Sequence, residues 1–332
     1  MNAKFKTQMM RWAICSTIVL LAQTTQAQIY STKFIRSERQ WEFDLNVGPT
    51  VFLGDVGGGK GAGTLFVKDV NPSTANIFYG LNVSYYPNSW LGFRGSFNRG
   101  RVAGFDSVIA QRGSVEINRK NRNLGFRSDI TEVNIAAEVY PFSYFVQEES
   151  FFNNKLRPYF TIGIGAFHFN PQGIYEEANG KKTWVDLKPL RLEGQGMSEY
   201  PNRKEYANVA FQMLFGFGIK YFINDQWYVG GELMQRYTFT DYVDDVSTTY
   251  IDPTLFAKYL PKEQVPIAQQ MMFKRALVNN RPVTDFVGKE RGDATNKDYY
   301  MSLFLKVGFR FGSRDTDVSC PGGRGRRSRS FY

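Results

Sequence analysis

Hydrophobic and polar residues alternate along the stretch YMSLFLKVGFRFG, residues 300–312. Every second residue from Met301 is apolar, and Ser302, Lys306 and Arg310 lie among the residues between. This period of two predicts a β-strand with one apolar and one polar face, because successive side chains point to opposite sides of a sheet. The apolar face points inward in a soluble sandwich but outward, toward lipid, in a membrane barrel. The rest of the chain must distinguish the two.

The same alternation recurs and predicts eight strands in all. Most of them exceed the usual length of strands in soluble proteins and match the about 9–11 tilted residues that cross a bilayer. The predicted strands occupy residues 41–55, 76–87, 90–102, 129–142, 157–169, 208–223, 227–242 and 300–312.

The predicted connections alternate in length. On one side the links are short at residues 87–89 and 224–225 and somewhat longer at residues 143–156. On the other side all four are long: residues 55–75, 103–128, 172–205 and 243–297. Short periplasmic turns and long extracellular loops are typical of outer-membrane barrels.

Aromatic residues make up 16% of the chain, and many fall at the predicted short-turn ends of the strands. Aromatic rings collect at membrane interfaces, so we expect a periplasmic girdle there. Its members are Trp41, Tyr85, Tyr140, Tyr221, Trp227, Phe309 and Phe311. A soluble β-sandwich with an excess of aromatic residues is the alternative.

We therefore predict an all-β fold: an eight-stranded antiparallel transmembrane β-barrel over residues 41–312, with long extracellular loops and short periplasmic turns. The barrel is expected in the cell outer membrane, surrounded by outer-membrane lipid. Because the number of strands is even, both termini are expected to be periplasmic.

The first 27 residues resemble a secretory signal peptide. The apolar run of residues 12–22 is too short to span a bilayer, which disfavours a retained membrane anchor. Cleavage after Ala27 leaves residues 28–40 as an N-terminal periplasmic segment. It removes three basic residues and no acidic one, which lowers the formal net charge from +10 to +7.

About half of the remaining charge lies in residues 313–332, a basic C-terminal tail with five Arg and two Asp. The body of the chain therefore lacks the continuous basic surface of a nucleic-acid-binding protein, and we predict no nucleic-acid partner.

If the apolar faces contact lipid, the alternate positions line the lumen. These positions carry five acids and five bases. The interior of an eight-stranded barrel is just wide enough for side chains to fill, and an unpaired buried charge is unfavourable. We therefore predict a charge network that closes the lumen, formed by Glu42, Asp44, Arg94, Glu132, Glu138, Lys220, Glu232, Arg236, Lys306 and Arg310.

Catalytic candidates are weak. His168, the only histidine, is expected by parity to face lipid or an interface, and no partnered base and nucleophile is recognisable. The stretch GDVGGGKGAG at residues 54–63 lacks the spacing of a phosphate-binding loop. The sequence therefore predicts neither an enzyme nor a cofactor.

Two further motifs leave alternatives open. The tripeptide RGD at residues 291–293 is either an adhesion signal or a chance occurrence. An aspartate group near the root of the last long loop offers a calcium site but does not follow the EF-hand order, so we predict no metal. The group consists of Asp241, Asp244, Asp245 and Asp252.

The last long loop has a helix-forming composition over residues 250–280, interrupted by Pro261 and Pro266. Its apolar residues recur near helical spacing. A helical cap over the barrel mouth and a helix that binds a partner are both consistent with this pattern.

Four segments together resemble the PorG-type outer-membrane barrels of Bacteroidetes. The resemblance extends from about Ile29 to Pro321, and the segment Thr240–Asp245 is its most specific part. It implies a structural component of the type IX protein secretion system that contacts periplasmic ring proteins, PorK and PorN. The segments are WEFDLNVGPTVFLGDVGG, YVGGELMQRYTFTDYVDDVSTTYIDP, RGDATNKDYY and the Cys-Pro after the last strand.

A general outer-membrane barrel that acts as an adhesin or a small-solute channel is the alternative function. The basic tail is the expected partner contact, because arginines pair with carboxylates or phosphates and an unpaired exported cysteine is reactive. The candidate contact residues are Cys320, Arg324, Arg326, Arg327 and Arg329.

Overall fold

The computed structural model describes residues 40–57, 72–108, 122–142, 155–224, 226–274 and 283–312. All of them belong to one compact unit, Arg39–Ser313. The predicted signal peptide, most of the N-terminal segment and the basic tail lie outside the described residues. So do the turn at residues 143–154 and most of the glycine-rich stretch.

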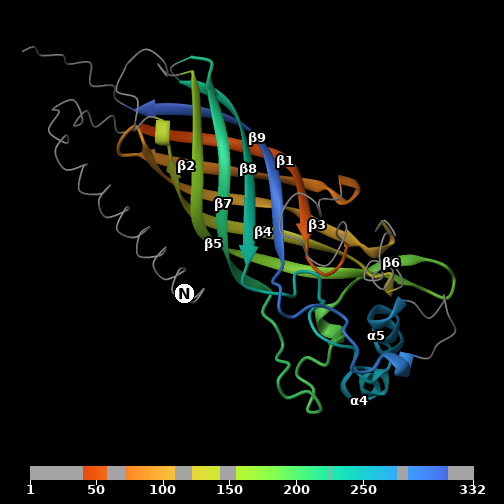
Figure 1. Cartoon of the computed structure of the whole chain (residues 1–332). Coiled ribbons are helices and arrows are strands. Elements are labelled where there is room, and N and C mark those ends of the chain that lie inside the picture. The colour runs from red at the N-terminus through yellow and green to blue at the C-terminus, as the bar shows by residue number, and fades with distance from the viewer. Residues whose placement is uncertain are drawn as a thin grey trace, which may run out of the picture. The chain divides into compact units, whose positions relative to one another are not determined.

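Eight antiparallel strands pair in sequence around a closed barrel (Figure 1). The order β4-β3-β2-β1-β9-β8-β7-β5 is closed by the pairing of β4 with β5. The strands are β1 (Gln40–Leu53), β2 (Asn76–Tyr86), β3 (Leu91–Phe105), β4 (Gly125–Val139), β5 (Leu156–Glu176), β7 (Val209–Phe222), β8 (Trp227–Thr238) and β9 (Tyr299–Gly312). The predicted eight-stranded antiparallel barrel is confirmed.

The barrel has an apolar exterior. Ile135, Ile164 and Leu305 point outward and are 66–69% exposed, while the residues on either side of them in sequence are buried or half-buried. A continuous belt of exposed aliphatic and aromatic side chains is the surface that lipid covers, so this is a membrane-spanning barrel rather than a soluble sandwich. No helix in the described part of the chain is long and apolar enough to cross a membrane.

Aromatic rings gather outside the short-turn end of the strands. Trp41 packs on Tyr85 with ring centroids 4.9 Å apart, and Trp227 packs on Phe309 at 5.0 Å. Tyr140, however, is not part of this girdle. Its side chain is only 2% exposed and packs inside the barrel, because it has the same parity as the lumen-facing Glu132 and Glu138 of β4.

The structure differs from the sequence prediction in strand length and number. Strand β5 runs seven residues past the predicted end at Phe169, and its extension pairs with β6 (Lys182–Asp186), which was not predicted. Strand β8 ends at Thr238 rather than Tyr242. Because β6 lies beyond the barrel wall, its five residues lack the long alternation of the membrane-crossing strands.

Backbones approach closely where β1 passes β9. A Cβ atom added at Gly48 would lie 1.8 Å from the carbonyl oxygen of Leu303, so only glycine fits there. We expect Gly48→Ala to destabilise the barrel by about 3 kcal/mol or more, because the obstructing atoms are backbone. The heat-modifiable gel mobility of the refolded protein should show a reduced folded fraction.

Gly95→Ala is the matched control, because a Cβ there meets nothing closer than 4.0 Å and points to the exterior. Equal folding of the two variants would contradict this account of Gly48.

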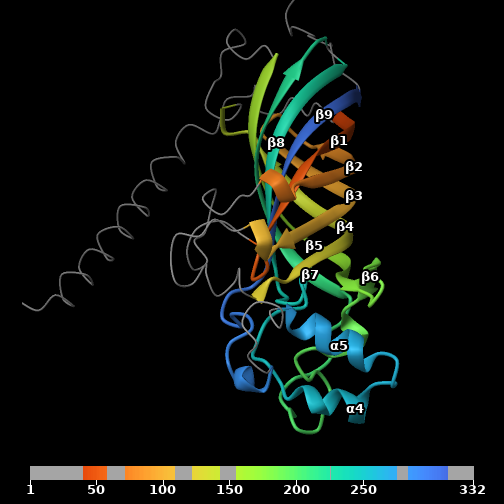
Figure 2. The same ribbon diagram turned by 90° about the vertical axis from the view of Figure 1, so that its right-hand side faces the viewer.

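The long connections fold into a layer over one end of the barrel, called here the loop layer. It comprises residues 54–57, 72–75, 106–108, 122–124, 177–208, 239–274 and 283–298. Figure 2 shows α4, α5 and β6 beyond this same end of the strands. Its helices are η3 (Pro72–Thr74), η4 (Asp106–Val108), η5 (Lys188–Leu190), η6 (Pro253–Leu255), α4 (Phe256–Tyr259), α5 (Val265–Met272) and η8 (Val283–Phe286).

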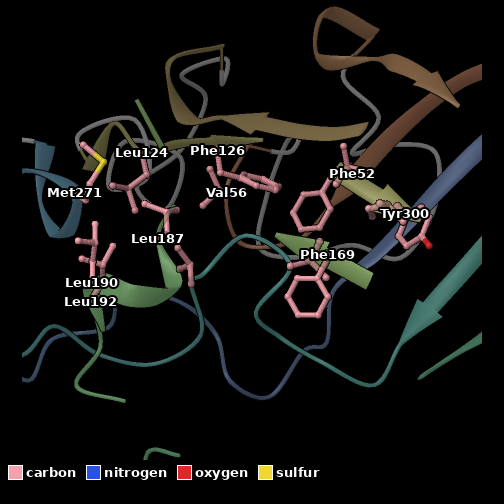
Figure 3. Packing of buried hydrophobic residues seen from close by; sticks show 14 of the residues in the cluster. Phe52, Val56, Leu124, Phe126, Phe169, Leu187, Leu190, Leu192, Met271 and Tyr300 are labelled. Carbon is pink, nitrogen blue, oxygen red and sulfur yellow. The ribbon is translucent and has the colours of Figure 1, made fainter. Parts of the chain in front are cut away.

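A hydrophobic core joins the loop layer to the barrel mouth (Figure 3). Leu190 and Leu192 lie near Met271 of α5, and Phe52 and Tyr300 extend the same cluster into the barrel. The apolar side chains of α4 and α5 therefore point into the layer rather than to solvent, as expected for a cap. Pro266 lies in the first turn of α5, where its missing N–H breaks no helical hydrogen bond.

Candidate functional site

The lumen is the site on which the sequence placed its charged candidates. All ten point into the barrel: nine are at most 3% exposed, and the Arg310 side chain is 11% exposed. They form three groups along the axis, and two of these groups share Glu138. All of these side chains lie in the lumen because the strands alternate between lipid-facing and lumen-facing positions.

The central group is built around Arg94 on β3. Its guanidinium donates two hydrogen bonds of 2.9 Å to Glu232 on β8 and one of 2.9 Å to Glu138 on β4. Lys306 on β9 lies 3.0 Å from Glu232 and 3.3 Å from Asp44 on β1. Side chains from five strands thus meet across the axis, and every charge has an opposite partner.

A second group occupies the short-turn end. The Lys220 ammonium on β7 lies 2.7 Å from Glu42 and 3.1 Å from Glu138. Arg310 donates to the other oxygen of Glu42 from Nε at 2.9 Å and from Nη2 at 2.7 Å. These contacts join β1, β4, β7 and β9 at the point where the chain enters and leaves the barrel.

The third group lies toward the loop layer and centres on Glu132. Its carboxylate accepts hydrogen bonds from Arg236 Nε at 2.9 Å, from Gln212 Nε2 at 2.9 Å and from the Tyr300 hydroxyl at 2.6 Å. Asn98 Nδ2 and Asn134 Nδ2 donate to the same carboxylate at 2.9 and 3.0 Å. One acid therefore organises the polar side chains of five strands.

Tyrosine hydroxyls complete the network, and the sequence reasoning missed this role. The donors are Tyr86 and Tyr140 to Glu138, Tyr159 to Glu232, Tyr228 to Asp44 and Tyr300 to Glu132. All five have the same parity as the lumen residues of the neighbouring strand positions, so the alternation that identified the charges could also have identified these tyrosines.

The filled lumen leaves little open space. A cavity of about 10 Å³ lies between the central and third groups, lined by Asn46, Asn98, Arg94, Arg236 and their neighbours. That volume holds about one water molecule. Within the described residues, the arrangement therefore acts as a plug of paired charges.

The structure places His168 and the RGD tripeptide in different parts of the molecule. His168 is exposed on the barrel exterior. Arg291 of the RGD tripeptide is 3% exposed and donates to Glu193 at 2.8 Å, so it is held inside the loop layer rather than displayed for adhesion.

The aspartates proposed for calcium separate. Asp252 caps η6 by accepting from the Thr254 N–H, and Asp245 accepts from the Tyr206 hydroxyl at 2.6 Å. Asp241 and Asp244 instead face Asp55, from the connection after β1, and Asp298, at the far end of their own connection between β8 and β9. Among the described residues, no group of three or more His, Cys, Asp or Glu side chains is arranged to hold a metal ion.

These buried carboxyls have raised pKa values. Burial and the neighbouring acids raise the pKa of Asp244 and of Asp298 well above the usual range. Burial raises the pKa of Asp241 and of Asp245 to about 7. The loop layer thus contains several carboxyls that favour the protonated form.

Buried ion pairs tie the loops to one another. Arg122 Nε donates to Asp106 at 2.9 Å, its Nη2 donates to the Asp55 carbonyl at 2.6 Å, and its Nη1 donates to the Arg291 carbonyl. Arg291 in turn binds Glu193. The connections after β1, β3, β5 and β8 are therefore held as one unit.

No protein-family model and no curated protein matches the chain. Solved structures that are similar include Ail, the attachment invasion locus protein of Yersinia pestis, at 9% identity and a TM-score of 0.35 over 82% of this chain and 99% of that one. Neisserial surface protein A has 7% identity and a TM-score of 0.33 over 83% and 98%. A major outer membrane protein from Thermus thermophilus has 11% identity and a TM-score of 0.35 over 82% and 99%. Likeness at this level carries no argument about function, and it is the strand pairing and inside-out polarity of this chain that establish a membrane-spanning barrel.

Proposed function

We propose that this protein is a non-conducting outer-membrane barrel that serves as a structural component of the type IX secretion system. The observation that carries the proposal is the lumen, closed by a network of five acids and five bases. A barrel that passes no solute acts through its surfaces, so its function lies in what it contacts.

The periplasmic surface is the proposed contact. Gln40 pairs with Gly312 at the short-turn end, so the chain enters and leaves the barrel on the same side. With the long loops outside, both termini are periplasmic in this proposal. The sequence resemblance to PorG-type barrels supports periplasmic ring proteins of the PorK and PorN type as the partners.

Affinity recovery of the intact protein from detergent-solubilised membranes tests this proposal. We expect the periplasmic ring proteins to co-purify with the full chain, and recovery to fall at least several-fold for a chain that ends at Gly312. The shortened chain keeps every barrel strand, so its gel mobility should remain heat-modifiable. Cys320→Ser tests the thiol separately.

Each failure has a distinct meaning. If the full, folded chain recovers no periplasmic partner, the secretion role is wrong. If recovery is unaffected by truncation and by Cys320→Ser, the tail is not the contact, and the turn at residues 143–156 with Glu148 and Glu149 becomes the candidate.

An adhesin is the second candidate, and the loop layer favours it. This layer has its own hydrophobic core and buried ion pairs, so it presents a fixed surface on the loop side. A small-solute channel is disfavoured by the paired charges in the lumen. Planar-bilayer recording should detect no stable conductance, and a large one would contradict both the plug and the proposed structural role.

A further inference from the structure

The barrel exterior carries charge on one side only. Over the part of the strands that pair around the barrel, the described outward-facing charged residues are Arg99 and Arg101 on β3 and Arg127 and Asp129 on β4. The outward positions of β1, β2, β7, β8 and β9 carry none. We call Arg99, Arg101 and Arg127 the arginine patch.

Strand register places the arginine patch at the edge of the apolar belt. Phe97 pairs with Val133 and Val133 with Ala166, which forms the last apolar rung across β3, β4 and β5. The next outward rung is Arg99–Thr131–His168, followed by Arg101–Asp129–Asn170. The patch therefore lies at headgroup level, on the side of the long loops.

The arginines differ in how far they are already paired. Arg101 Nε donates to Asp129 at 2.6 Å, with the side chains 41% and 56% exposed. Arg99 is exposed and, within the described residues, forms no ion pair. It is attracted to Asp129 only at longer range, so its guanidinium remains open to a ligand outside the barrel.

Arg127 belongs to a polar group that includes a tryptophan. Its Nε donates to Gln172 at 2.9 Å, and its guanidinium stacks 4.2 Å from the ring centroid of Trp184 on β6. Asn170 and Gln172 both donate to Asp186, at 2.9 and 2.8 Å. The strand that sequence reasoning missed thus brings an aromatic ring and a carboxylate to the patch.

These groups match the chemistry of a phosphorylated sugar. Guanidinium groups bind phosphate in bidentate fashion, amides and carboxylates exchange hydrogen bonds with sugar hydroxyls, and an indole ring prefers the membrane interface. We propose that the arginine patch binds the phosphorylated sugar headgroup of a glycolipid in the outer leaflet. The acyl chains of that lipid lie on the belt below, against Phe97, Val133 and Ile164.

Native mass spectrometry of the detergent-solubilised full-length protein tests the proposal, with bis-phosphorylated lipid A as the probe. We expect bound lipid A, and at least tenfold weaker binding by the double variant Arg99→Gln/Arg127→Gln. Lys204→Gln/Lys262→Gln is the matched control, because both lysines are exposed in the loop layer and the net charge changes equally. Heat-modifiable mobility checks that each variant is folded.

Three further measurements separate a lipid site from an ion site. Dephosphorylated lipid A should bind at least tenfold more weakly than lipid A. Inorganic phosphate, added at the concentration at which lipid A saturates the protein, should not displace the bound lipid A. Phosphatidylglycerol, which lacks the sugar, should also bind more weakly. Equal binding of the dephosphorylated lipid, an equal loss in the lysine control, or full competition by inorganic phosphate would overturn the proposal.

Discussion

Replacing Glu232 with alanine is expected to lower the free energy of unfolding of the barrel by about 3–5 kcal/mol. Glu232 binds Arg94 through two hydrogen bonds of 2.9 Å and Lys306 through one of 3.0 Å, and it is 2% exposed. Its removal leaves two cations with less compensation in a lumen that admits almost no water. Urea unfolding of the refolded protein in lipid vesicles measures the change.

Two variants separate charge from packing in this experiment. Glu263→Ala removes an exposed loop carboxylate and should change stability by less than about 0.5 kcal/mol. Adding Lys306→Met to Glu232→Ala should restore part of the loss, because one of the uncompensated charges is then gone. A Glu232→Ala barrel as stable as the Glu263→Ala control would show that the network does not stabilise the fold.

Raising the pH from about 4 to about 7 is expected to destabilise the loop layer. The pKa of Asp245 rises from 3.8 in a model peptide to about 7 because of burial. Between these values the folded layer holds a proton that the unfolded chain has lost, so stability falls as pH rises and becomes constant above both values. For this one carboxyl the loss is about 4 kcal/mol. Amide exchange of Val246 to Ile251, corrected for intrinsic rates, measures it.

Asp245→Asn tests whether the Asp245 carboxyl causes this pH dependence. An asparagine keeps an acceptor for the Tyr206 hydroxyl and tolerates the left-handed backbone at this position, where φ is 62°. The variant should show a smaller loss of protection between pH 4 and 7 than the unmodified protein. Asp252→Asn, at the cap of η6, should retain the original slope. The interpretation fails if Asp245→Asn and Asp252→Asn respond to pH alike.

The barrel could be predicted from the sequence because apolar and polar positions alternate with a period of two along its strands. A residue such as Glu132 or Lys306 is assigned to the lumen by parity alone, since each membrane-crossing strand must alternate between lipid and interior. Tyr140 shows what happens when parity is ignored. Its place at a strand end predicts a member of the aromatic girdle, yet it has the same parity as Glu138 and donates to that lumen carboxylate.

The contacts of the loop layer could not be predicted from the alternation because they join residues that are distant in the sequence. Asp298 and Asp244 meet although they are far apart in the chain, and Arg122 links loops that follow three different strands. Strand β6 is five residues long and has no alternation to reveal it. The composition of residues 250–280 did indicate helix, but only the packing of Met271 and Phe256 shows which side of the helices is covered.

The pairing of β1 with β9 constrains how the protein can assemble. Glu42 and Arg310, which join these strands in the lumen, are 268 residues apart in the chain. Until β9 is in place, β1 and β8 each present an open edge of unpaired backbone groups, which favours association with other chains. Closure over so long a separation is also slow. The folding barrel therefore depends on a factor that covers the open edges of β1 and β8 until β9 has paired with both. A chain that stops before Tyr299 should aggregate rather than insert into the membrane.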